Sequence, residues 1–144
     1  MTGKVLCHTE TKMVCNPLEF EGIDYICQKL IIMVILDKPI SCEELVRLAD
    51  NFYGDMIKGV VDVDQELLAL DAELHSDLEG FLLSGGSQQE ALWGINLYPE
   101  ADEEDFLEFD SLINIRPRQG NRSRDVENEE IRERIRTIVN KYMA

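Results

Sequence analysis

The chain has 144 residues, of which 44% are hydrophobic, and its formal net charge is −15. This length suits one domain with its own core, and the apolar fraction argues against intrinsic disorder. The acidic balance argues against nonspecific nucleic-acid binding, because affinity for phosphates is mostly electrostatic. No apolar run approaches the roughly 20 residues of a membrane span.

The first 32 residues differ from the rest, because they lack a clear periodicity and contain three of the four cysteines. No cysteine pair has C-x-x-C spacing, so we expect free thiols and a cytoplasmic protein. We interpret residues 1–32 as a poorly ordered or misassigned N-terminal extension, with Met33 as the start of one domain over residues 33–144. The alternative is a longer structured segment over residues 25–36.

A short apolar strand at residues 34–36 precedes the first expected helix. Ser41 and Glu44 have capping-box spacing, in which each side chain satisfies a backbone donor at the helix start. Apolar residues then recur at helical spacing as far as Phe52, and Gly54 is expected to end the helix.

Several β-branched residues over positions 56–64 predict the next strand, which can pair as a hairpin with residues 67–72. Segments 76–79 and 87–90 both have the pattern Ser-x-x-Glu and predict two further helix starts. A glycine pair should end the first of these helices, and Gly94 should end the second.

Two more strands are expected at residues 95–98 and 106–115, separated by an acidic turn. The last helix carries one apolar stripe, made of Ile131, Ile135, Ile138, Val139 and Tyr142. These elements predict an α+β fold: a mostly antiparallel sheet of four to five strands with two or three helices packed on one face. The helices include a long C-terminal amphipathic helix.

An arginine-rich segment at residues 114–124 is the strongest candidate for a ligand site. It holds four arginines and no acid, and it leads from an expected strand to the last helix. Such junctions favour anions through free N–H groups and the helix dipole, and arginine adds bidentate donors. The candidate ligand-binding residues are Asn114, Arg116, Arg118, Gly120, Asn121, Arg122 and Arg124. The alternative is that these arginines simply pair with the chain's own acids.

A second candidate site surrounds His75. Strand spacing would place Glu73, His75 and Asp77 on one face, where they could hold a metal or where the histidine could act as a general base. Asp62 and Asp64 alternate along a neighbouring expected strand and are further metal candidates. Against this, Asp77 is an ordinary first-turn acid, and the aspartates could line the solvated face of a sheet. No metal or cofactor is therefore assigned.

Five segments carry a resemblance to a known family: Lys-Pro-Ile-Ser at 38–41, Gly-Asp-Met at 54–56, Glu-Leu-His at 73–75, Leu-Trp-Gly-Ile-Asn-Leu-Tyr-Pro at 92–99, and Phe-Asp-Ser-Leu-Ile-Asn-Ile-Arg-Pro-Arg-Gln-Gly-Asn-Arg-Ser-Arg at 109–124. On these segments the chain, over residues 33–142, resembles an uncharacterised prokaryotic family catalogued as domain of unknown function 5674. The resemblance implies no activity, substrate or cofactor.

The sequence thus predicts a small acidic binding or interaction module that holds an anionic small molecule or protein partner at its arginine-rich loop. The alternative is a metal-dependent hydrolase or nuclease that uses His75 and nearby carboxylates. Membrane association is not expected, and the oligomeric state is left open.

Overall fold

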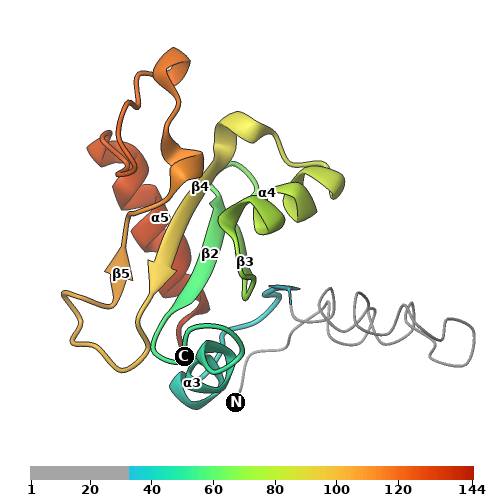
Figure 1. The fold of residues 1–144 in the computed structure, drawn as a ribbon, viewed down its shortest axis with the longest axis vertical. Helices are drawn as coiled ribbons and strands as arrows, with labels where there is room; N and C mark the ends of the chain where they lie inside the picture. Colours follow the sequence, from blue (N-terminus) through green and yellow to red (C-terminus); the bar gives the residue numbers. More distant parts are fainter. Residues whose placement is uncertain (1–32) are drawn as a thin grey trace, which may run out of the picture.

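A five-stranded antiparallel sheet forms the centre of the computed structural model, which describes residues 33–144 (Figure 1). Its strands are β1 (Val34–Ile35), β2 (Ile57–Asp62), β3 (Leu67–Leu70), β4 (Leu92–Leu97) and β5 (Leu107–Glu108). They lie in the order β1-β3-β2-β4-β5, and every neighbouring pair is antiparallel. The predicted β2–β3 hairpin is confirmed.

Three α-helices accompany the sheet over the described range: α3 (Cys42–Ala49), α4 (His75–Ser84) and α5 (Glu129–Tyr142). Single 3-10 turns lie at η1 (Gln89–Ala91), η2 (Leu112–Asn114) and η3 (Pro117–Gln119). The α+β class and the long C-terminal helix are confirmed. No helix within residues 33–144 is both long and apolar enough to cross a bilayer.

The helices cover both faces of the sheet, so the expectation of a single covered face is wrong. On one face, α3 and α5 pack in the same hydrophobic cluster as Trp93, Ile95 and Leu97. On the other face, α4 packs in a cluster with Val60 and Leu92. Since successive strand residues point to opposite faces, β4 is buried along its whole length. The apolar stripe of α5 predicted its burial, and four of its five members are buried.

One of the three predicted capping boxes caps its helix. The Ser41 hydroxyl accepts from the Glu44 amide at 3.2 Å, as expected, although α3 ends at Ala49, before Phe52. The boxes at 76–79 and 87–90 are wrong: α4 already begins at His75 without a side-chain cap, and residues 89–91 make only a 3-10 turn. In α4, burial of His75 and Leu78 outweighs the local capping pattern.

Gly94 lies in the middle of β4, so the prediction that it ends a helix is wrong. A β-carbon at this position would stand 2.4 Å from Cβ of Ser111, because the chain after β5 crosses the strand closely. That crossing also explains why residues 109–115 do not continue β5. Instead, the Asn114 side chain pairs with Gly94 like a neighbouring strand: its Oδ1 accepts from the Gly94 amide at 2.8 Å and its Nδ2 donates to the Gly94 carbonyl at 3.0 Å.

Candidate functional site

Residues 114–127, here called the arginine loop, are held in shape by two buried asparagines. Asn121 Nδ2 donates to the carbonyls of Asn114, Ser123 and Asp125 at 2.7, 3.2 and 2.6 Å. Asn121 Oδ1 accepts from the Glu127 amide at 2.8 Å. These amide bonds fix the loop from inside, since buried polar groups of this kind are stable only when paired. The side chains of Asn114 and Asn121 are therefore engaged within the protein.

A tight turn projects from this framework. Arg116 and Asn121 exchange backbone hydrogen bonds across the turn, with N···O distances of 2.6 and 3.1 Å. Gly120 closes the turn at φ +81°, in the left-handed region that a glycine adopts without strain.

Two of the four arginines are bound by the protein's own carboxylates. Arg116 Nη2 lies 3.3 Å from Glu79 Oε2, and the two side chains are only 11% and 14% exposed. The same guanidinium lies 5.0 Å from the centre of the Trp93 ring. Desolvation lowers the pKa of Arg116, and the nearby Glu79 opposes that shift. Arg124 Nε, by contrast, pairs at the surface with Asp110 Oδ1 at 2.5 Å.

Arg118 and Arg122 differ from this pair. Both side chains are exposed, and neither makes an ion pair within residues 33–144. The structure thus divides four arginines that look equivalent in the sequence. Two hold the loop to the body of the protein, and two are open to solvent.

A small nest of backbone amides lies beside Arg122 and holds the side chain of Glu127. One carboxylate oxygen of Glu127, Oε2, accepts from the Arg122 amide at 2.5 Å, the Ser123 amide at 2.9 Å and the Ser123 hydroxyl at 3.1 Å. Consecutive N–H groups that converge in this way form concavities that bind anions. The hydrogen bonds from Ser123 and Arg122 lower the pKa of the Glu127 carboxyl. No pattern in the sequence predicts this role of Glu127.

His75, the residue proposed for catalysis, lies buried at the first turn of α4. Its Nε2 is 2.8 Å from the Ile95 carbonyl, so this nitrogen carries the proton that is donated. Burial lowers the pKa of His75 to about 4, so the ring is neutral near neutral pH. Its neighbour Asn96 donates to Glu108 Oε2 at 2.8 Å and to the Asp110 carbonyl at 3.2 Å.

The carboxylates predicted to join His75 as metal ligands are not gathered around it. Because His75 begins a helix, the strand spacing that would have aligned it with Glu73 and Asp77 does not exist. Asp77 is exposed on α4. Among the residues that the structure describes, no group of three or more histidine, cysteine or acidic side chains is placed to hold a metal ion.

Asp62 and Asp64 also have separate roles. Strand β2 ends at Asp62, so the predicted alternation of the two along one strand face is wrong. The buried Asp62 carboxylate accepts from the amides of Asp64 and Gln65, both at 2.9 Å, and so stabilises the turn into β3. Asp64 lies at the surface, 3.4 Å from Arg134 of α5.

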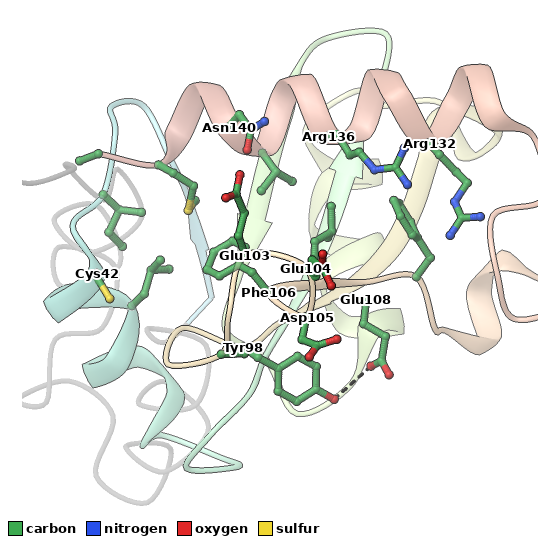
Figure 2. A pocket seen from close by; sticks show the side chains of 18 of the residues that line it. Cys42, Tyr98, Glu103, Glu104, Asp105, Phe106, Glu108, Arg132, Arg136 and Asn140 are labelled. Atoms are coloured by element: carbon green, nitrogen blue, oxygen red, sulfur yellow. Dashed lines mark hydrogen bonds between the residues drawn. The ribbon is translucent and has the colours of Figure 1, made fainter.

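A groove of about 1030 Å³ lies on the α5 side of the molecule and had no counterpart in the sequence analysis. Figure 2 shows it between α5, which contributes Arg132, Arg136 and Asn140, and the acidic segment that joins β4 to β5. Cys42 of α3 lies at one end of the groove and is a free thiol, as expected. The other three cysteines lie outside the described residues.

The fold and the loop define a small α+β protein whose arginine-rich loop is fixed by buried asparagines. The chain belongs to the family DUF5674, described as a protein of unknown function, whose family model matches residues 34–142. This confirms the resemblance carried by the sequence motifs. The comparisons with curated proteins and with solved structures found no match.

Proposed function

We propose that the chain is a noncatalytic binding module that holds an anionic small molecule or protein partner at the arginine loop. One observation supports this most strongly: two amides and a hydroxyl converge on a single carboxylate oxygen of Glu127, next to the unpaired Arg122. The nest therefore has the geometry of an anion site, and its present occupant belongs to the chain itself.

An incoming anion would take the place of the Glu127 carboxylate. Because Glu127 is exposed, its side chain can leave the nest without disturbing the core. Arg118 and Arg122 would then add charge-assisted hydrogen bonds to the ligand, which are stronger than neutral ones. The asparagine framework keeps the donors in place before binding, and this lowers the entropy lost on association.

The test uses inorganic phosphate as the probe, followed through the NMR amide signals of Arg122 and Ser123. The variants Arg118→Ala and Arg122→Ala should each weaken binding about tenfold, since a hydrogen bond to a charged group contributes roughly 1.5–3 kcal/mol. Glu127→Ala should strengthen binding, because it removes both the competing acceptor and a repelling charge. Arg47→Ala, which removes an exposed arginine of α3 that makes no ion pair within residues 33–144, is the charge-matched control.

The proposal fails if phosphate does not shift these two amides, or if Arg47→Ala weakens binding as much as the loop variants do. It does not extend to metal-dependent hydrolysis, since His75 and the carboxylates do not meet. We propose in addition that the protein is cytoplasmic, on the basis of its cysteine spacing, and that residues 33–144 form an independent domain.

A further inference from the structure

We propose that the groove beside α5 is a docking site for a cationic, amphipathic segment of a partner protein. The groove borders the arginine loop at Asp125 but is not lined by Arg122 or Ser123, and it calls for an occupant of the opposite charge. Three observations support the inference: the size and floor of the groove, its unpaired acidic lip, and the prior neutralisation of its arginines.

The floor of the groove is apolar and large enough for several side chains. Phe106, Leu107, Phe109 and Met143 are partly buried and line it, together with Val139 of α5. A volume of about 1030 Å³ lies at the upper end of the roughly 300–1,000 Å³ typical of small-molecule pockets. A groove of this size beside a helix suits the apolar face of a peptide segment.

The exposed edge of the groove, here called its lip, is negatively charged. Glu103, Glu104 and Asp105 line it and are exposed, and they make no ion pair within the described part of the chain. In Figure 2 these three side chains lie across the groove from the arginines of α5. Glu108, on the same side, accepts only from Asn96 and from the Tyr98 hydroxyl, the latter at 3.0 Å.

The two arginines of the groove are already neutralised by neighbouring acids. Arg136 Nη1 binds Glu129 Oε1 at 3.0 Å and also binds Glu133. Arg132 lies 3.7 Å from Asp125 and 3.9 Å from Glu129. Both guanidinium groups also stack on the Phe109 ring, 4.6 and 5.5 Å from its centre. The charge that remains free at the groove is therefore negative, and it attracts lysine or arginine side chains.

One polar atom gives a more specific indication. Nε of Arg132 is buried and has no hydrogen-bond partner among the residues that the structure describes. Buried donors are seldom left unpaired, because each one costs free energy. A backbone carbonyl of a docked segment would supply the acceptor once the guanidinium turns towards the groove. The net charge of −15 would also speed the approach of a cationic partner through long-range attraction.

The probe is a fluorescein-labelled helical peptide of about 14 residues, made of leucine and lysine with the leucines on one face. A peptide of equal composition, rearranged so that it has no apolar face, is the comparison. Fluorescence anisotropy with the full chain at about 0.15 M salt, where distant charges are screened, gives both affinities. The amphipathic peptide should bind at least about tenfold more tightly, because only it can bury apolar surface in the groove.

Two sets of variants locate the binding. The first triple variant neutralises the lip with Glu103→Gln, Glu104→Gln and Asp105→Asn, and it should weaken peptide binding about tenfold. The control triple variant, Asp37→Asn, Asp50→Asn and Asp77→Asn, changes the net charge equally and should alter the affinity less than about twofold. At the exposed groove residue Asn140, Asn140→Arg should weaken binding and Asn140→Glu should strengthen it. A merely structural disturbance would move both Asn140 variants in the same direction.

The proposal is overturned if the two peptides bind equally, or if the two triple variants weaken binding equally. It is also overturned if sedimentation shows that the chain forms a dimer which the lip variants abolish, because the groove would then belong to a second copy. None of these outcomes depends on phosphate binding at the arginine loop, so the two proposals succeed or fail separately.

Discussion

Asp71 makes the pH dependence of folding stability a direct test of the structure. This aspartate follows β3, is 2% exposed and has φ +73°. Its Oδ2 accepts from Nδ2 of Asn51 at 2.5 Å. Burial raises the pKa of Asp71 from 3.8 to about 7, although the bond from Asn51 acts in the opposite direction. The folded protein thus keeps a proton on this carboxyl that the unfolded chain releases.

The sign of the effect follows from the raised pKa. Asp71 contributes its full stability below about pH 4, and this contribution is lost as the pH rises to about 7. At about 1.4 kcal/mol for each pKa unit, a shift of this size corresponds to at most about 4 kcal/mol. We expect less than this limit, because buried sites relax and admit some water.

The contribution of His75 to folding stability changes in the opposite direction over nearly the same pH range. Burial lowers its pKa from 6.5 to about 4, so its contribution is present above pH 6.5 and is lost as the pH falls towards 4. The limiting size is about 3 kcal/mol on the same scale. Between about pH 4 and 6.5 the loss of the Asp71 contribution and the gain of the His75 contribution therefore largely cancel, so the stability of the wild-type protein changes little.

Replacing Asp71 by asparagine separates the two effects. The amide can still accept from Asn51, and asparagine tolerates positive φ. Asp71→Asn should therefore be more stable than the wild type by up to a few kcal/mol at about pH 8, with a difference that shrinks towards pH 4. The measurement is urea unfolding of both proteins from about pH 4 to 8. Subtracting one profile of unfolding free energy against pH from the other cancels the contributions of the titrating groups that both proteins share.

Asp50→Asn, at an exposed aspartate next to Asn51, is the control and should leave the profile unchanged. A difference profile for Asp71→Asn that is flat from acid to alkaline pH would refute the reasoning. It would mean that the Asp71 carboxyl titrates in the folded protein as it does in the unfolded chain.

Two further predictions concern the fold. Gly94→Ala should destabilise the protein by about 2–4 kcal/mol in urea unfolding, because the new Cβ would meet Ser111 at 2.4 Å. The control is Gly80→Ala, in open space on α4, which should be neutral or stabilising by up to about 1 kcal/mol. A chain that begins at Met33 should melt cooperatively within a few degrees of the full chain, as measured by circular dichroism, and a broad or much lower transition would show that the earlier residues are needed for stability.

Local patterns sufficed where a segment's structure depends on its own residues. The Ser41 cap, the β2–β3 hairpin and the buried stripe of α5 all follow from spacing along a short stretch of chain. The same reasoning failed at segments 76–79 and 87–90, which have the same Ser-x-x-Glu pattern as a true cap. At those places contacts with the sheet decide where the helical turn begins, and a pattern of four residues contains no information about such contacts.

Gly94 and Asn114 show the limit most clearly. A glycine followed by apolar residues indicates the end of one element and the start of another. Here the glycine is required by a segment twenty positions later in the chain, whose asparagine pairs with both of its backbone groups. Only the three-dimensional fold brings these residues together, so no local pattern could have identified the pair.

The arginine loop was located from its sequence, but the roles of its residues could not be assigned. Arg116 and Arg124 differ from Arg118 and Arg122 only in what surrounds them. Glu79, which binds Arg116, lies on α4, and Asp110, which binds Arg124, follows β5. The four side chains are chemically identical, so their separation into internal and free groups required the positions of distant acids.

Buried amides explain how so acidic a chain leaves charged groups free at its surface. Asn96, Asn114 and Asn121 are buried, and their side chains donate to backbone carbonyls and, in the case of Asn96, also to the Glu108 carboxylate. A neutral amide offers donors and an acceptor without the desolvation cost of burying an ion. The body of the protein thus needs few of its own charges for internal pairing. Arg118 and Arg122 of the loop and the acids of the groove lip are exposed and make no ion pair within residues 33–144, and we propose that each set binds a partner of opposite sign.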